Sequence, residues 1–218
     1  MRVAEGFVVA EQDVPGVRAP GDTTEVRTTI DGSTDADRLE QRVIRFAPGR
    51  SLPRGEPEKQ EVLFVVSGSG TLELEGESYA LETWTGAFVA PGESYRIDTQ
   101  DGMVAVSVVA DASELGVGAS RRVTVRYEDQ PVLPASPNRE FRYLVNQDAG
   151  CLDVTQFVGV IPPGKRRSTA TPTTRSSSSW RAPARTTLPG RRYRSPRGPA
   201  STCRRTCGTA SKTAGGPK

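Results

Sequence analysis

The sequence predicts an all-β protein up to about residue 161, followed by a segment of different character. Short runs rich in Val, Ile, Phe and Thr alternate with turn residues along this first part. Glycine and proline number 22 and 17 among the 218 residues, which favours many turns over long helices. Short strands at regular intervals are typical of a β-sandwich or a β-barrel.

The expected strands follow one another at short intervals. Those of the first part are 42–46, 61–66, 71–74, 78–81, 87–90, 94–97 and 103–109. Turn residues separate them, among them Ala47-Pro48-Gly49, Glu75-Gly76-Glu77 and Pro91-Gly92. After Asp111 a linker leads to three further expected strands, 122–127, 141–145 and 154–161. Trp84 and Phe88 are expected in the core.

The chain changes character at Pro162-Pro163-Gly164. Residues 165–218 contain 14 Lys or Arg and no Asp or Glu. The other 15 basic residues and all 26 acidic residues lie in 1–164, so this part carries a net charge of −11 against +3 for the whole chain. The tail has almost no aliphatic residue besides Leu188, so we expect it to be disordered, because it cannot bury enough apolar surface to offset the entropy of ordering.

Several classes of protein are disfavoured. No stretch of about 18 apolar residues predicts a membrane span, and the N-terminus has no secretion signal, so we expect a cytoplasmic protein without membrane contacts. The three cysteines, Cys151, Cys203 and Cys207, are an odd number and imply no disulfide framework. Cys203 and Cys207 have no histidine or further cysteine nearby, so as a zinc motif the pair is weak.

A set of spaced residues between Gly49 and Thr99 carries a family resemblance. Gly49 is followed at fixed spacing by positions 55 and 57, Glu61 and Gly68, and later by Ala90-Pro91-Gly92-Glu93-Ser94-Tyr95. The segment resembles the cupin superfamily. Its first motif is Gly, five residues, His-x-His, three or four residues, Glu, six residues, Gly, and its second is Pro-x-Gly-x-x-His. The resemblance implies a double-stranded β-helix, the jelly-roll barrel.

The metal ligands that this resemblance implies are largely missing. The sequence has no histidine, and it places Gly55, Pro57 and Tyr95 at the three histidine positions, so only Glu61 remains. Mn, Fe, Ni, Cu or Zn in such a barrel is held mainly by imidazole, so we expect no metal in this chain. Two interpretations of Glu61 stay open: a remaining acid at the barrel mouth, hydrogen-bonded or solvated, or a polar anchor for a small ligand together with Tyr95. Tyr95 is expected to be an ordinary residue of the barrel rim.

Residues 151–164 resemble the start of a second cupin, since they repeat the strand-then-Pro-Gly form of 43–49. His-x-His and a glutamate would come next, but the chain continues Arg166-Arg167-Ser168-Thr169-Ala170-Thr171. In a shifted frame, the codons over Thr169 and Thr171 permit histidine, that over Arg175 permits glutamate, and Ser176 to Ser179 become aliphatic. We therefore predict a frameshift near Lys165. The alternative is a genuine basic tail that binds nucleic acid or an acidic surface; it lacks aromatic residues apart from Trp180 and Tyr193, and we consider it the weaker interpretation.

The sequence thus predicts four parts: an N-terminal arm (1–37), a cupin barrel (38–111), a linker with the first strands of an incomplete second cupin (112–164), and the basic tail (165–218). The resemblance implies kinship with metal-dependent bicupin enzymes acting on small polar molecules: dioxygenases, isomerases or ureidoglycine aminohydrolase-like enzymes. Without ligands this chain is expected to be inactive, and no catalytic residue is assigned. The alternative is a metal-free module that binds a small polar ligand or forms a homodimer through its sheets. Poor solubility is expected, because 122–161 have apolar faces without a partner sheet.

Overall fold

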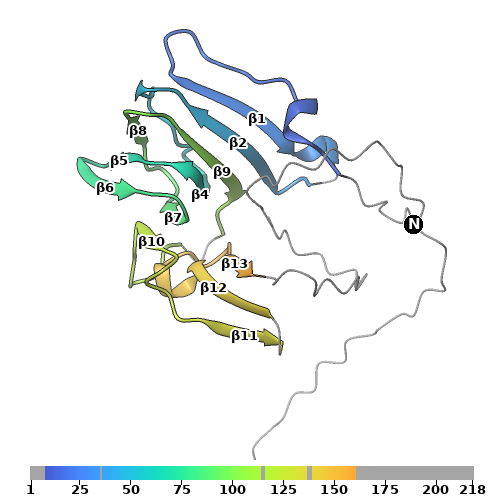
Figure 1. The fold of residues 1–218 in the computed structure, drawn as a ribbon, viewed down its shortest axis with the longest axis vertical. Coiled ribbons are helices and arrows are strands. Elements are labelled where there is room, and N and C mark those ends of the chain that lie inside the picture. Colours follow the sequence, from blue (N-terminus) through green and yellow to red (C-terminus); the bar gives the residue numbers. More distant parts are fainter. Residues whose placement is uncertain (1–7, 35, 114–115, 137–138, 161–218) are drawn as a thin grey trace, which may run out of the picture. The chain divides into compact units, whose positions relative to one another are not determined.

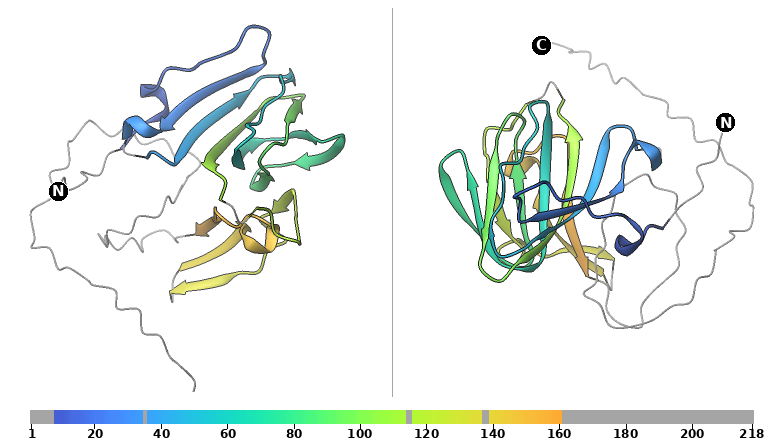
Figure 2. Two further views of the ribbon diagram at one scale, coloured as in Figure 1. Left: turned by 180° about the vertical axis from the view of Figure 1, so that it is seen from behind. Right: turned by 90° about the horizontal axis from the view of Figure 1, so that it is seen from above.

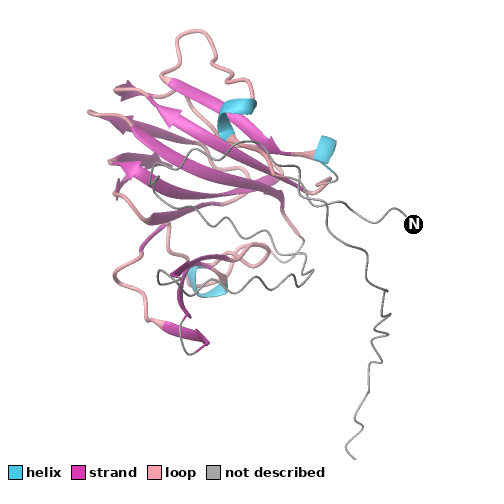
Figure 3. Cartoon of the chain, turned by 45° about the vertical axis from the view of Figure 1, so that its right-hand side comes forward, coloured by secondary structure: helices cyan, strands magenta, loops and turns pink. Residues whose placement is uncertain are grey.

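The computed structural model describes residues 8–34, 36–113, 116–136 and 139–160. All described residues belong to one compact unit. The expected disorder of 165–218 therefore lies outside the described residues. Within them, thirteen strands and three short 3-10 helices form the structure (Figure 3). None of these helices has the length and apolar character needed to cross a membrane.

The strands form three antiparallel sheets (Figure 1). The largest has the order β1-β2-β9-β4-β7-β10, with β1 (Thr24–Ile30), β2 (Leu39–Phe46), β9 (Met103–Asp111), β4 (Lys59–Gly68), β7 (Thr85–Val89) and β10 (Thr124–Arg126). The second has the order β3-β8-β5-β6, with β3 (Gly49–Arg50), β8 (Tyr95–Thr99), β5 (Gly70–Leu74) and β6 (Glu77–Leu81). The third comprises β11 (Leu133–Ser136), β12 (Arg139–Val145) and β13 (Gln156–Val160). The helical turns are η1 (Glu11–Asp13), η2 (Gly32–Thr34) and η3 (Gln147–Ala149).

The first two sheets enclose one apolar core. Alternate residues of a strand point to the same face, and the inward series include Ile44 and Phe46 on β2 and Leu63 and Val65 on β4. Leu72 and Leu74 of β5 and Ile97 of β8 meet them from the opposite sheet. A barrel closed in this way confirms the expected all-β fold class.

A second apolar cluster lies on the outside of the barrel sheet. Val62 of β4 and Phe88 of β7 point away from the barrel interior and pack against Leu144, Val145 and Cys151. Figure 2 shows the third sheet, in yellow to orange, beside the barrel. The residues that follow the barrel therefore cover part of its outer face.

The expected strands are all present, with ends shifted by a few residues; Ile161, the end of the last one, lies outside the described residues. Sequence reasoning missed β1, β3 and β11. Strand β1, within the expected N-terminal arm, pairs along β2, but most of its residues are half-buried on both faces, so it shows no clear apolar alternation. The prediction for Phe88 is confirmed, since it is 1% exposed, but that for Trp84 is wrong. Trp84 is 44% exposed and lies at a tight turn, with its ring edge-on to Tyr127.

Candidate functional site

The barrel interior becomes polar at one end. Along β4 the inward residues change from Val65 and Leu63 to Glu61, and along β9 they change from Ala105 to Ser107. The Tyr95 hydroxyl donates a hydrogen bond to Glu61 Oε2 at 3.1 Å, and Ser107 Oγ donates one to Glu61 Oε1. Glu61 is only 6% exposed, so its carboxylate depends on these donors for solvation.

Tyr95 lies inside the barrel, so the expectation of a rim residue is wrong: the side chain is 1% exposed. Burial raises the pKa of the Tyr95 phenol well above its usual value, and the charge of Glu61 adds to the rise, while Arg54 opposes it. The phenol therefore stays protonated and serves as a donor. The structure joins Tyr95 and Glu61 by a hydrogen bond, and Glu61 is hydrogen-bonded on both oxygens. That the pair anchors a ligand stays a prediction.

The two remaining metal-ligand positions offer no donor atoms. Gly55 has a φ of +138°, and a Cβ built on it would collide with the carbonyl oxygen of Glu93 and lie 3.3 Å from Ser94 Cα. The loop that carries it is tied to β8, since Arg54 N and Tyr95 O are 2.9 Å apart and Tyr95 N and Arg54 O 2.8 Å. Pro57 is exposed and has no side-chain donor.

These residues do not fit a transition metal. Of the four ligand positions that the resemblance implies, only Glu61 carries a side chain that could bind such an ion, and a transition metal in a barrel of this kind is held mainly by imidazole. In the described part of the chain, no group of three or more His, Cys, Asp or Glu side chains is arranged to hold a metal ion. We therefore derive no reaction step through a metal in this barrel.

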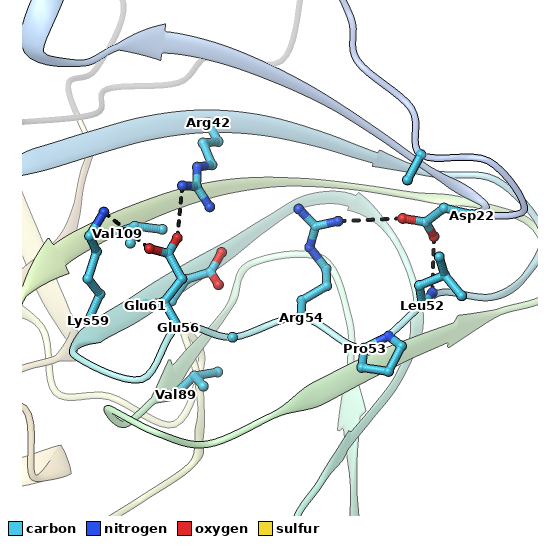
Figure 4. Close-up of a pocket in the computed structure, with 12 residues that line it drawn as sticks. Asp22, Arg42, Leu52, Pro53, Arg54, Glu56, Lys59, Glu61, Val89 and Val109 are labelled. Atoms are coloured by element: carbon cyan, nitrogen blue, oxygen red, sulfur yellow. Dashed lines mark hydrogen bonds and ion pairs between the residues drawn. The ribbon is translucent and has the colours of Figure 1, made fainter.

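A pocket of about 290 Å³ opens beside Glu61 (Figure 4). Its apolar wall includes Leu52, Val89 and Val109. The charged residues are three cations and three anions, namely Arg42, Arg54, Lys59, Asp22, Glu56 and Glu61. The pocket thus carries no net formal charge.

Two of the three cations are held by carboxylates at hydrogen-bonding distance. Arg42 Nη2 lies 2.5 Å from Glu40 Oε2 and 3.0 Å from Glu56 Oε1, and Lys59 Nζ lies 3.1 Å from Glu56 Oε2. Burial alone would raise the pKa of Glu56, but the hydrogen bonds from Lys59 and Arg42 lower it below its usual value. Arg42, Lys59, Glu40 and Glu56 therefore form one charged network.

The third cation, Arg54, lies farther from its carboxylate partner. Its Nη1 is 3.6 Å from Asp22 Oδ2, beyond hydrogen-bonding distance, although the side chain is only 18% exposed. Asp22 is held by its other oxygen, which accepts from the backbone N–H groups of Thr24 and Leu52 at 3.2 and 3.1 Å. Sequence reasoning missed both pocket arginines. Arg42 could have been found, because it shares the inward alternation of Ile44 and Phe46, whereas Arg54 lies in a loop without such a signal.

The comparisons with known proteins bear on the fold alone. No protein-family model matches the chain, and no curated protein matches it. A Pseudomonas aeruginosa protein whose name describes it as glyoxylate-induced superposes with a TM-score of 0.52 at 21% identity, over 62% of this chain and 54% of that one. A Thermotoga maritima protein described as a predicted oxalate decarboxylase gives 0.44 at 15%, over 49% of this chain and 100% of its own. The polyketide cyclase RemF of Streptomyces resistomycificus gives 0.43 at 24%, over 50% and 89%.

Proposed function

From the cupin fold that the described residues adopt, we propose that this chain is the metal-free first part of a two-barrel protein related to metal-dependent cupin enzymes. The observation that best supports this proposal is the lack of space at the ligand positions. Gly55 has no room for a side chain, and Tyr95 fills the interior and hydrogen-bonds to Glu61. The barrel then supplies a scaffold and a pocket for a small polar molecule. The metal-dependent step, of a dioxygenase, isomerase or ureidoglycine aminohydrolase-like kind, belongs to the second barrel. We therefore expect no metal-dependent activity from the first barrel.

The extent of the Pseudomonas match supports the two-barrel part of the proposal. It covers 62% of this chain, whereas 38–111 are 74 of the 218 residues, so it extends beyond the expected first barrel. This chain in turn spans only about half of that protein's length. The third sheet supplies strands where a second barrel would begin, and Phe141, Tyr143 and Phe157 meet edge to face on it.

The frameshift is the genetic part of the same proposal, and the residues it concerns lie outside the described ones. Its test is the nucleotide sequence around codons 160–180. An open shifted frame that encodes two histidines, a glutamate and an aliphatic run supports the proposal. Early stop codons in that frame would establish the basic tail as genuine. In that case salt-dependent nucleic-acid binding, lost on truncation after Gly164, becomes the function to test.

The decisive protein experiment is metal analysis of the chain, purified without a histidine tag because a tag would supply the missing ligands. We expect far less than one Mn, Fe, Ni, Cu or Zn per chain. A stoichiometric transition metal would overturn the metal-free barrel. Glu61→Gln serves as the matched variant: loss of such a metal on this change would locate it in the barrel.

The homodimer expected from the sequence is untested and stays a prediction, as does poor solubility. Sedimentation at two protein concentrations measures both. A monomer that stays soluble at high concentration would contradict them.

A further inference from the structure

We propose that the pocket beside Glu61 binds a small zwitterion of the amino-acid type, with its carboxylate on Arg54 and its ammonium group on Glu61. This inference rests on the proposed metal-free barrel, because a metal on Glu61 would take the oxygens that the ammonium group needs. It adds the chemical class of the ligand and a role for Arg54.

Arg54 is suited to the ligand carboxylate because no carboxylate of the described residues lies within hydrogen-bonding distance of it. Arg42 and Arg54 are equally exposed, at 18%, yet Arg42 binds two carboxylates at 2.5 and 3.0 Å. Arg54 lies 3.6 Å from Asp22, its single carboxylate partner among the described residues, and its other side-chain contact is with the Tyr95 phenol. A partly buried guanidinium offers a fork of N–H donors that matches a carboxylate in a bidentate arrangement. Since Asp22 Oδ1 keeps its two backbone donors, a ligand carboxylate on Arg54 leaves Asp22 hydrogen-bonded.

The position of Glu61 in the pocket favours a zwitterion over a simple anion. Its carboxylate lies in the same pocket and would repel a lone anion. Two carboxylate oxygens can accept about four hydrogen bonds, and Tyr95 and Ser107 provide two, so acceptor capacity remains for an ammonium group. The Tyr95 phenol makes side-chain hydrogen bonds with both Glu61 and Arg54, and both residues line the pocket, so the two charges lie near one another.

The size and wall of the pocket set the rest of the ligand. About 290 Å³ accommodates a small amino acid, and Leu52, Val89 and Val109 offer an apolar wall for its side chain. The equal numbers of cations and anions favour a ligand without net charge. Valine meets these requirements and is the probe of choice.

The test is calorimetric titration of the full, tag-free chain, treated with a chelator and then dialysed, with three compounds of matched skeleton. Valine has both charged groups, 3-methylbutanoate lacks the amine, and 2-methylpropylamine lacks the carboxylate. We expect saturable binding of valine at millimolar or lower concentration and at least about tenfold weaker binding of the other two. No saturable binding of valine, or equal binding of valine and 3-methylbutanoate, overturns the inference.

Variants locate the site. We expect Arg54→Gln and Glu61→Gln each to weaken valine binding about tenfold or more, and Arg54→Lys, which keeps the charge but not the fork, to weaken it by a smaller factor. Arg50→Gln is the control, because Arg50 is half-exposed and pairs with Glu73 outside this pocket. Unchanged affinity in Arg54→Lys and Glu61→Gln overturns the assignment, even if Arg54→Gln fails to fold. The titrations use metal-stripped protein. A metal found in the untreated chain would therefore overturn the proposed function without changing the result of the valine titrations.

Discussion

The barrel and the third sheet are built from similar strands but differ in how they are covered. Leu72 and Ile97 at the barrel centre are fully buried between two sheets. Strand β12 buries Leu144 and Val145 against the outside of the barrel, whereas Tyr143 on the same strand is 37% exposed. Strand propensity is therefore sufficient to form a sheet in both places. A closed interior that can hold a buried carboxylate such as Glu61 requires the opposite sheet as well.

The largest effect on stability is expected at Gly55, where the loop backbone lies close to the backbone of residues 93–94. Gly55→Ala should destabilise the protein by about 3–5 kcal/mol, because the Cβ would meet the Glu93 carbonyl oxygen at a positive φ. The matched control is Gly76→Ala in the hairpin turn, where φ is +87° and nothing lies within 4 Å. It should cost only about 1 kcal/mol, the strain of the positive φ alone. Urea unfolding measures both changes.

Equal losses in the two glycine variants would show that the loop at residue 55 can move away from β8. In that case the backbone could accommodate a histidine at position 55, and it would not close the barrel to a metal. This outcome would contradict the lack of space at Gly55 that supports the proposed function.

The second prediction compares the two regions directly. Amide hydrogens of β12 and β13 should exchange with solvent through openings whose free energy is about 2 kcal/mol or more below that for β4 and β9. The reason is that the described residues cover the third sheet on one face only, whereas the barrel strands lie between two sheets. Native-state hydrogen exchange read by NMR measures the difference. Equal protection of the four strands would mean that the third sheet and the barrel unfold as one unit.

The sequence predicts features that depend on local signals better than features that depend on contacts between distant segments. The β-strands and the spacing from Gly49 to Tyr95 predicted the barrel, because alternation and turn glycines are local signals. The burial of Tyr95 was not predicted, because it depends on the loop at Arg54 lying along β8, a contact between segments about 40 residues apart. The exposure of Trp84 likewise depends on its place in a turn. Glu61 was identified from its motif, but its donor Ser107 was not, since nothing local marks that serine as facing inward.

A smaller effect is expected from the Tyr95 hydroxyl. Tyr95→Phe should destabilise the barrel by about 1–2 kcal/mol, because Glu61 loses a donor in a buried position. Tyr79→Phe is the matched control: Tyr79 is partly buried against the same core, and its phenol makes no hydrogen bond within the described residues. It should change stability by less than about 0.5 kcal/mol. If the two variants are equally stable in thermal and urea unfolding, the Tyr95–Glu61 bond contributes nothing to the fold.

The smallest effect concerns the polar contact that joins the barrel to the residues before the last strand. Gln60 Nε2 donates to Asp153 Oδ2 at 2.7 Å, and the backbone N–H of Ser113 donates to the same oxygen at 3.1 Å. Burial alone would raise the pKa of Asp153, but the hydrogen bonds from Ser113 and Gln60 lower it below its usual value. A carboxylate with a lowered pKa in the folded state stabilises the protein above its unfolded-state pKa, and this stabilisation is lost as the pH falls through the folded-state pKa.

Asp153→Asn should therefore be slightly less stable than the wild type at neutral pH, and the gap should close as the pH falls below about 4, the usual pKa of an aspartate. Urea unfolding at several pH values measures the gap, with Asp101→Asn in an exposed turn as the control. Closure of the gap together with faster exchange of β13 amides in Asp153→Asn would show that this contact couples the third sheet to the barrel. A gap that does not depend on pH would mean that the charge of Asp153 has no part in joining the two regions. The apolar cluster around Val62 and Phe88 would then hold them together with neutral hydrogen bonds such as that from Gln156 Nε2 to the Leu63 carbonyl oxygen.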